Sequence, residues 1–337
     1  DVAASTVFAT NMLLSTVTNL SARMTGTTLN SAAFEAVPCF FTNSGTEAVE
    51  GAIKAARKYA FKKDGNNRDH EIIAMNGSFH GRSLGALSVT GNPHYQEAFK
   101  PLIGKIVFAD FNDADDVISR MNENTCAVIM ETIQGEGGIY PANADFLNIV
   151  SKECEKRDIL LILDEIQCGM GRSGKMFAYE HYGIRPDIVT VAKALGCGIP
   201  IGAFVVGEKA VEALEAGDHG STYGGNPLAT AAANAVFDLF EKYHVLENVN
   251  EVGEYLGKVL ESLKEKHACI KDVRGMGLIR GIELSVPAGQ VVSKCIEKGL
   301  LVISAEHDVI RFVPPLVIEK GHVDIMAGIL DGVLNEI

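Results

Sequence analysis

Short apolar runs alternate with amphipathic stretches over the first two thirds of the chain. Five of these runs have the continuous hydrophobicity of strands that are buried on both faces. They are Cys39–Thr42, Glu71–Met75, Ala127–Met130, Ile159–Leu163 and Ile188–Val191. The segments between them have helical periodicity, as in the stretch from Ala48 to Ala60. This alternation predicts an α/β fold with a mostly parallel central sheet, in which ligands bind at the carboxyl ends of the strands.

The pattern changes after Asn226-Pro227, where a long helical region rich in Ala, Glu and Lys runs to about His267. The elements expected beyond it are strands over 277–284, 300–304 and 309–313 and helices over 287–298 and 319–336. We therefore expect a large α/β domain over residues 36–240 and a smaller C-terminal α+β domain over 241–337. Residues 1–35, rich in Thr, Ser and Ala with weak periodicity, form an atypical N-terminal segment.

Composition and charge narrow the class of protein. The chain has 337 residues, with 30 Lys and Arg against 43 Asp and Glu and a formal net charge of −13. An acidic chain lacks the basic footprint that general nucleic-acid binding requires. No apolar run is long enough to span a bilayer, and no secretory signal pattern opens the chain. The seven cysteines are scattered without a CxxC pair, which favours free thiols in a reducing compartment. We expect a cytoplasmic protein without nucleic-acid or membrane partners.

The strongest single chemical signal is Lys193, the only charged residue between Ile188 and Gly207. A lysine in an apolar run is costly to bury unless it pairs, reaches solvent or is kept neutral. Desolvation lowers the pKa of a lysine and suits an amine that reacts with a carbonyl group. The alternative is a lysine at a strand end whose ammonium group reaches solvent, and this stretch alone is equally compatible with both.

Two further segments place functional groups at strand ends. Asp164 follows the fourth apolar run, so its carboxylate is expected at the ligand-binding edge of the sheet. It can bind a metal, hold a ribose or pair with a protonated pyridine nitrogen, or it can simply cap a turn. Ser44 and Glu47 have the spacing of a capping box at a helix start. Gly45 and Thr46 lie between them and expose backbone N–H groups, so the same helix start is a candidate phosphate site.

A glycine-rich stretch, Gly169 to Gly174, has the G-x-G-x-x-G spacing of a dinucleotide site. It lacks the helical continuation and the later acidic residue that such a site requires, so it indicates a turn. An NAD-binding oxidoreductase built around this stretch is a rival hypothesis, and a non-catalytic binding protein on the same scaffold is another.

Phe79 and Arg82 share a glycine-containing loop after the second apolar run. They can stack on a ring and hold a carboxylate, or be an ordinary packed aromatic and a solvated cation. The nine histidines are dispersed without metal-ligand spacing, so no metal site is expected.

Ordered motifs are spread over about residues 36–337. They are Phe41–Ala48, Ser78–Leu87, Glu131–Gly138, Leu161–Lys175, Pro186–Gly196, His219–Pro227, Arg274–Leu278 and Arg311–Leu316. As a set they resemble the class III pyridoxal-phosphate-dependent aminotransferases, most closely the acetylornithine aminotransferases. The family usually has Pro where this chain has Thr132, and residues 1–35 do not resemble its N-terminal arm. The resemblance implies the fold type I of pyridoxal-phosphate-dependent transferases.

The resemblance also implies pyridoxal 5′-phosphate as cofactor and a homodimer with active sites shared between subunits. Lys193 matches the lysine that attaches to the cofactor and later serves as general acid–base, and Asp164 matches the acid that pairs with the pyridinium nitrogen. The other matching cofactor positions are Gly45 and Thr46 at the phosphate, Phe79 on the ring, Gln167 near the phenolic oxygen and Thr222 at the neighbouring subunit's phosphate.

The implied reaction moves the ω-amino group of N-acetylornithine to 2-oxoglutarate in a ping-pong sequence that serves arginine biosynthesis. Arg82 and Ser221 match positions that contact acetylornithine. Arg311 matches the arginine that binds the α-carboxylate of glutamate or 2-oxoglutarate, and Glu136 resembles the acid that neutralises this arginine when the amino donor binds. Ornithine, succinylornithine, succinyldiaminopimelate and 4-aminobutyrate stay open as alternative donors.

Overall fold

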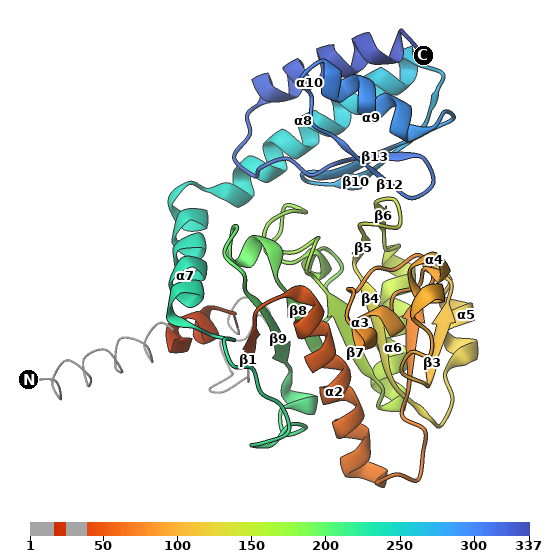
Figure 1. Cartoon of the computed structure of the whole chain (residues 1–337), viewed down its shortest axis with the longest axis vertical. Helices are drawn as coiled ribbons and strands as arrows, with labels where there is room; N and C mark the ends of the chain where they lie inside the picture. Colours follow the sequence, from red (N-terminus) through yellow and green to blue (C-terminus); the bar gives the residue numbers. More distant parts are fainter. Residues whose placement is uncertain (1–16, 25–38) are drawn as a thin grey trace, which may run out of the picture. The chain divides into compact units, whose positions relative to one another are not determined.

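The computed structural model describes residues 17–24 and 39–337, and these form two compact units (Figure 1). The first unit comprises the described residues up to Met130 together with Asn143–Gln167 and Tyr182–Glu241. The second comprises Glu131–Ala142, Cys168–His181 and Lys242–Ile337. The expected domains meet between residues 240 and 241, close to where the second unit resumes at Lys242, but two earlier segments also belong to that unit. Most of the atypical segment 1–35 lies outside the described residues.

A seven-stranded sheet forms the centre of the first unit, in the order β1-β9-β8-β7-β4-β2-β3. The strands are β1 Cys39–Thr42, β2 Glu71–Met75, β3 Ile106–Ala109, β4 Thr125–Glu131, β7 Leu160–Asp164, β8 Ile188–Val191 and β9 Gly202–Val206. The pairs β2–β3, β2–β4 and β7–β8 are parallel, and β9 runs antiparallel to both β1 and β8. The predicted α/β fold with a mostly parallel sheet is confirmed. The sequence pattern did not predict β3 and β9, because β3 is short and β9 follows a glycine-rich run.

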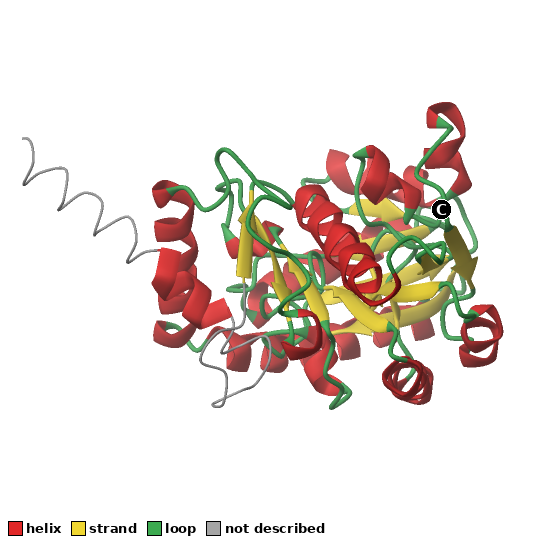
Figure 2. Cartoon of the chain, turned by 90° about the horizontal axis from the view of Figure 1, so that it is seen from below, coloured by secondary structure: helices red, strands yellow, loops and turns green. Residues whose placement is uncertain are grey.

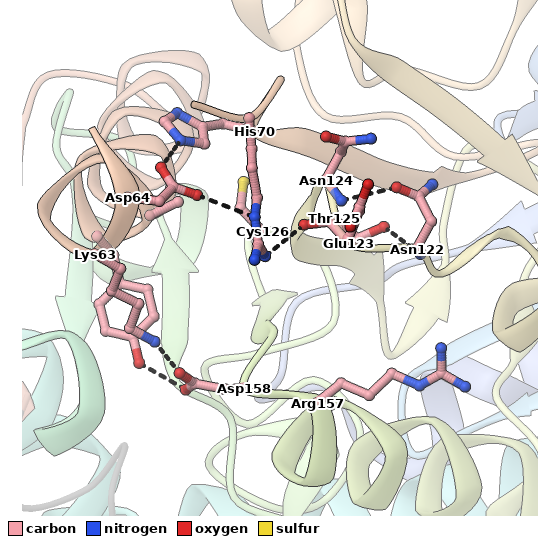
Figure 3. Close-up of a pocket in the computed structure, with 13 residues that line it drawn as sticks. Lys63, Asp64, His70, Asn122, Glu123, Asn124, Thr125, Cys126, Arg157 and Asp158 are labelled. Carbon is pink, nitrogen blue, oxygen red and sulfur yellow. Dashed lines mark hydrogen bonds and ion pairs between the residues drawn. The ribbon is translucent and has the colours of Figure 1, made fainter. Parts of the chain in front are cut away.

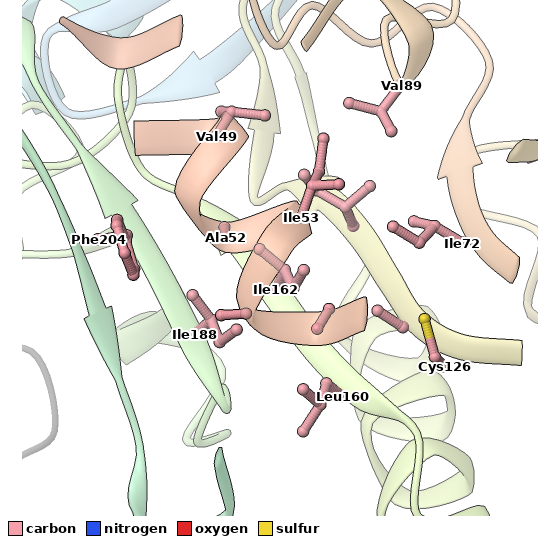
Figure 4. Packing of buried hydrophobic residues seen from close by; sticks show 14 of the residues in the cluster. Val49, Ala52, Ile53, Ile72, Val89, Cys126, Leu160, Ile162, Ile188 and Phe204 are labelled. Atoms are coloured by element: carbon pink, nitrogen blue, oxygen red, sulfur yellow. The ribbon is translucent and has the colours of Figure 1, made fainter. Parts of the chain in front are cut away.

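The core of this unit forms where helix α2 (Gly45–Asp64) packs on β7, β8 and β9. Figure 4 shows Ile53 of this helix above Ile162 and Ile188 of the sheet. Full burial of such a side chain contributes about 1.5–3 kcal/mol to folding. A Cβ added to Gly51 would lie 2.2 Å from the Phe204 ring, so only glycine permits this close approach of helix and strand.

Further helices complete the first unit, and Figure 2 shows helices on both sides of the strands. They are α3 Leu84–Ser88, α4 Pro93–Gln96, α5 Ala114–Arg120, α6 Ala144–Arg157 and α7 Pro227–Lys242. Helix α6 packs on β7 and α5 packs on α6. Residues 17–24 are helical, and Arg23 forms a 2.7 Å ion pair with Asp238 of α7.

The second unit is built on a four-stranded antiparallel sheet in the order β10-β11-β13-β12. Its elements are β10 Ile270–Met276, β11 Ile279–Leu284, β12 Ile303–Ala305 and β13 Val309–Phe312, with helices α8 Val245–Lys266, α9 Ala288–Glu297 and α10 Lys320–Leu334. A two-stranded ladder of β5 (Ile133–Gln134) and β6 (Tyr140–Pro141) belongs to the same unit. The second unit therefore has the predicted α+β composition.

The helical region expected up to about His267 consists of two helices, α7 and α8. His244 adopts a left-handed conformation with φ 49°, and it separates α7 from α8. A left-handed residue cannot continue a right-handed α-helix, so the chain turns here. The same break lies next to the point where the second unit resumes.

Among residues 17–24 and 39–337, none of the helices combines the length and hydropathy needed to cross a membrane. In the same part of the chain, no group of three or more His, Cys, Asp or Glu side chains is placed to hold a metal ion.

Candidate active site

The predicted residues of the first unit gather where parallel strands end. Asp164 is the last residue of β7, and Lys193 follows β8 after a single intervening residue. The turn after β1 leads into the start of α2 at Gly45, and the segment after β2 carries Phe79. Chain segments that leave parallel strands at their carboxyl ends share one edge of the sheet, so this edge is the candidate ligand-binding edge.

Asp164 is paired with a residue that the sequence analysis did not select, His80. The two side chains are buried, and His80 Nδ1 lies 2.7 Å from the Asp164 Oδ2 atom. The other carboxylate oxygen, Oδ1, accepts a 3.0 Å hydrogen bond from the Ile166 backbone N–H. The His80 backbone N–H donates to the Thr90 hydroxyl at 2.9 Å, which fixes the loop beneath the ring. A buried carboxylate needs such partners, because desolvation of an unpaired charge is costly.

The sequence shows that His80 lies within a family motif, but it does not show that His80 pairs with Asp164. The histidine lies between Phe79 and Arg82 within the Ser78–Leu87 motif. Its partner Asp164 is 84 residues away in the sequence, so only the folded sheet brings the two together.

The start of α2 is capped as predicted. The Ser44 hydroxyl accepts a 3.4 Å hydrogen bond from the Glu47 backbone N–H. The Glu47 carboxylate reaches back and accepts from the backbone N–H of Asn43 at 2.7 Å, one residue before the expected N-cap. The first N–H groups of a helix have no intrahelical acceptor, so those of Gly45 and Thr46 are available to an anion.

The backbone around this helix start is packed closely enough to require glycine. A Cβ on Gly45 would lie 2.9 Å from the Ile166 side chain. Gly81 has φ +137°, and a Cβ there would lie 2.4 Å from the Thr46 hydroxyl oxygen. That hydroxyl is also 2.8 Å from the Ser83 hydroxyl, so the segment after β2 is tied to the helix start.

For Lys193 the sequence left two possibilities open, a buried amine and a side chain that reaches solvent. Its side chain is exposed in this chain, at the start of a short 3₁₀ turn (Lys193–Leu195) after β8. The structure therefore supports the alternative, a lysine at a strand end whose ammonium group reaches solvent. Its backbone has φ 44°, a left-handed conformation that is uncommon for a residue with a side chain and that concentrates at functional sites.

Arg82 and Phe79 contact the same aromatic neighbour. The Arg82 guanidinium carbon lies 4.0 Å from the centroid of the Tyr95 ring and 5.2 Å from that of Phe79. The two rings meet edge to face at 6.0 Å. Arg82 is exposed and Phe79 is half-buried.

Three further predicted residues lie in the first unit. Gln167 is half-buried just beyond β7. The Ser221 hydroxyl accepts hydrogen bonds from Asn43 Nδ2 at 3.1 Å and from the Gly224 backbone N–H at 3.0 Å. Thr222, next to it, is exposed.

The remaining two predicted residues, Arg311 and Glu136, belong to the second unit and form an ion pair. Arg311 lies on β13 and is 8% exposed, and its NH1 atom lies 2.6 Å from Glu136 Oε1. Glu136 lies between β5 and β6, and the Glu306 backbone N–H donates to its carbonyl oxygen at 3.2 Å. The structure thus brings together the two residues that the resemblance assigned to one substrate carboxylate.

The glycine-rich stretch from Gly169 to Gly174 is a turn of the second unit. Gly171 and Gly174 have positive φ values of 80° and 97°, and a 3₁₀ turn over Ala178–His181 follows instead of the long helix of a dinucleotide site. Arg172 donates to the backbone carbonyls of Leu278 and Pro314, and burial lowers its pKa to about 10. This geometry does not support the NAD-binding hypothesis.

A polar pocket of about 270 Å³ lies at the opposite edge of the sheet, where β2 and β4 begin (Figure 3). In its wall His70 lies 2.7 Å from Asp64, and Lys63 forms an ion pair with Asp158. Burial raises the pKa of the Cys126 thiol in its wall to about 12. The predicted site residues do not line this pocket.

The comparison with protein families decides the class. The family model described as aminotransferase class III matches residues 2–334. The chain belongs to the class III aminotransferase family. The resemblance found from the sequence motifs is therefore confirmed.

Relatives and solved structures of this aminotransferase agree with that assignment. An acetylornithine aminotransferase of Clostridium acetobutylicum is 50% identical over 293 residues, which are 87% of this chain and 76% of that protein. One of Methanocaldococcus jannaschii is 48% identical over 298 residues, 88% of this chain and 75% of that protein.

Among solved structures, an amine transaminase of an uncultivated Pseudomonas species matches with a TM-score of 0.87 and 28% identity. The match covers 95% of this aminotransferase and 81% of that chain, and that structure is described as PLP-bound. The predicted transferase fold is confirmed.

Proposed function

We propose that this aminotransferase uses pyridoxal 5′-phosphate to move the ω-amino group of N-acetylornithine to 2-oxoglutarate. The donor assignment is supported by the names of four relatives that are 44–50% identical, all acetylornithine aminotransferases. The cofactor assignment is carried by one observation, the buried Asp164–His80 pair at the carboxyl end of β7. A carboxylate held there provides a fixed negative charge for a protonated ring nitrogen.

The other residues at this edge fit the same cofactor. The start of α2 offers the N–H groups of Gly45 and Thr46 to a phosphate, with the positive end of the helix dipole behind them. Phe79 is half-buried, and its ring can stack on the cofactor ring. Gln167 lies three residues after the end of β7 at Asp164. When bound, pyridoxal phosphate supplies an aldehyde that reacts with amines and a ring that takes up electrons from the substrate.

Lys193 provides the reacting amine in this proposal. Its Nζ would hold the cofactor and would move a proton during amino transfer, as a general acid–base. The exposed side chain suits this role, because the amine must be reached by both cofactor and substrate. Thr222, also exposed, is proposed to reach the phosphate bound by a second copy of the chain.

Substrate binding is assigned to two groups of residues. Arg311 is proposed to hold the α-carboxylate of glutamate or 2-oxoglutarate in a bidentate contact, with Glu136 neutralising the arginine when the amino donor is bound. In the first unit, Arg82 and Ser221 are proposed to contact the acylated donor. The exposed guanidinium of Arg82 is oriented by the Tyr95 ring, which leaves it able to bind a carboxylate.

A homodimer in the cytoplasm completes the proposal. Tyr223 and Leu228 are 72% and 70% exposed beside Thr222, and a second subunit would cover this apolar surface. All seven cysteines lie in the described residues and are free thiols, which suits a reducing compartment.

A panel of amino donors with 2-oxoglutarate tests the substrate assignment. We expect glutamate formation to be fastest with N-acetylornithine and slower with ornithine, succinylornithine, succinyldiaminopimelate and 4-aminobutyrate. If another donor is preferred by kcat/KM while N-acetylornithine gives no glutamate, the substrate assignment is wrong and the class assignment stands.

A further inference from the structure

Thr190, on strand β8, carries a hydroxyl group that the proposed mechanism does not use. The residue is fully buried, and within the described part of the chain its Oγ1 atom has no hydrogen-bond partner. Most buried polar groups in proteins are hydrogen-bonded, since leaving one unsatisfied destabilises the fold. A buried hydroxyl in this state calls for a physical explanation.

The register of the sheet identifies its neighbours. Thr190 pairs with Asp164 on β7 and with Phe204 on β9. Directly paired residues point to the same face of a sheet, as do the residues two positions away on the same strand. Those two are Ile188 of β8 and Ala192, which lies just beyond the end of the strand, and both are buried. Among these four neighbours, Asp164 alone offers a side-chain acceptor, because the other three are apolar.

The backbone already links Thr190 to the segment after Asp164. The Thr190 carbonyl oxygen accepts a 2.9 Å hydrogen bond from the Glu165 backbone N–H. Each carboxylate oxygen of Asp164 can accept more than one hydrogen bond, so an oxygen that accepts from His80 or Ile166 can also accept from a hydroxyl. Rotation of the threonine about χ1 is the movement that would bring its hydroxyl to this carboxylate.

From this arrangement we infer that Thr190 is a positioning residue for Asp164, a role that rests on the proposed function. Its hydroxyl donates to the Asp164 carboxylate in the cofactor-bound protein and helps to fix the carboxylate for a ring cation. In the cofactor-free protein the same hydroxyl is unsatisfied. The hydroxyl therefore costs stability without the cofactor and contributes affinity with it.

The substitution Thr190→Val separates these two effects, because valine has the shape of threonine without the hydroxyl. We expect the cofactor-free variant to melt about 2 °C above the wild type, since a buried unsatisfied group is removed. We expect its affinity for pyridoxal 5′-phosphate, followed by cofactor absorbance in a titration, to fall about tenfold or more, because a hydrogen bond to a charged group is lost. Thr190→Ser keeps the hydroxyl and should retain wild-type affinity.

A second buried threonine provides the matched control. The hydroxyl of Thr90 is fully buried and already donates to the Ala86 carbonyl oxygen at 3.0 Å. Thr90→Val should therefore lower the melting temperature of the cofactor-free protein, which is opposite to the expected effect of Thr190→Val. In an Asp164→Asn background, Thr190→Val should cost much less affinity than in the wild type, since the acceptor charge is gone.

The outcomes distinguish this inference from the proposed function. If wild-type protein does not bind pyridoxal 5′-phosphate, the proposed function fails and the inference fails with it. If the wild type binds the cofactor and Thr190→Val binds it equally well, only the inference is overturned. It is also overturned if cofactor-free Thr190→Val is destabilised like Thr90→Val, because the hydroxyl would then already have a partner.

Discussion

The two units each contain an acidic side chain paired with a basic one, and the pairs differ in how deeply they are buried. In the first unit, Asp164 ends a central strand and receives both His80 at 2.7 Å and the Ile166 backbone at 3.0 Å. In the second unit, Arg311 is 8% exposed on β13, whereas the side chain of Glu136 is 31% exposed in a turn. Both members of the first pair are buried, whereas the second pair has one buried and one half-buried member.

This difference suits two different tasks. A charge that must face the same cofactor group throughout a reaction cycle benefits from a preorganised carboxylate with several donors. An arginine that must receive one substrate carboxylate but not the other substrate benefits from a partner that can leave and return. Breaking a buried pair is costly unless the freed charge finds a new partner, and a substrate carboxylate supplies one.

The largest effect is expected from Asp164→Asn, which removes the charge of the firmly held pair and keeps its shape. We expect kcat/KM to fall by a factor on the order of 1,000, since loss of a buried charge partner costs about 3–5 kcal/mol. Both half-reactions should slow to the same extent, because the residue serves both. Steady-state kinetics with each substrate pair, with circular dichroism as a check on folding, would measure this. Near-wild-type kinetics would show that the pair is only structural.

A smaller effect is expected from His80→Phe, which keeps a ring beside Asp164 but removes the N–H donor. Cofactor affinity should fall about 10- to 100-fold, the equivalent of one hydrogen bond to a charged group. Titration of the cofactor-free variant with pyridoxal 5′-phosphate would measure the loss. The exposed His94 provides a matched control, and His94→Phe should bind the cofactor as the wild type does. Equal affinity in both variants would remove His80 from the site.

A selective effect is expected from Glu136→Gln in the loosely held pair. Without the carboxylate, Arg311 keeps its charge free for a substrate carboxylate, so the glutamate half-reaction should be unchanged or faster. The KM of the amino donor should rise about tenfold, since the arginine is no longer neutralised. Single-turnover kinetics of each half-reaction would separate the two, with the exposed Glu297→Gln as control. Equal slowing of both half-reactions would contradict an exchangeable pair.

The smallest effect is expected from Cys197→Gly, in the segment that carries Lys193. Cys197 has φ 47°, a conformation that is strained for a residue with a Cβ and relaxed for glycine. Relief of this backbone strain outweighs the entropy cost of the new glycine, so the exchange should stabilise the fold by about 0.5–1 kcal/mol. The melting temperature should rise by a few degrees. Thermal unfolding would measure it. A lower melting temperature would show that the cysteine side chain makes contacts worth more than this strain.

The sequence pattern predicted the strands of the central sheet best where apolar runs are continuous, as in Leu160–Asp164. It missed β10 (Ile270–Met276), where Lys271, Asp272 and Arg274 interrupt the hydrophobic signal of a half-exposed strand. Such a strand is defined by its pairing with β11, which local sequence does not show.

The candidate site was predictable to a similar degree. Asp164 and the α2 start were recognisable because each combines a strand end with a functional group. The sequence left the exposure of Lys193 open, because an apolar stretch contains both a buried strand and the exposed turn that follows it. His80 and Thr190 could not be recognised from the sequence, because each is related to Asp164 only through the fold: His80 by a hydrogen bond and Thr190 by strand register.

Attachment of the cofactor to Lys193 is the central claim, and one measurement tests it most directly. Purified protein is incubated with pyridoxal 5′-phosphate, reduced with borohydride, digested and mapped by mass spectrometry, with Lys193→Ala treated in parallel. We predict a single pyridoxyl label, on the peptide that contains Lys193, and no label in the variant. A label on a different lysine, or an unlabelled wild-type protein, would contradict the account.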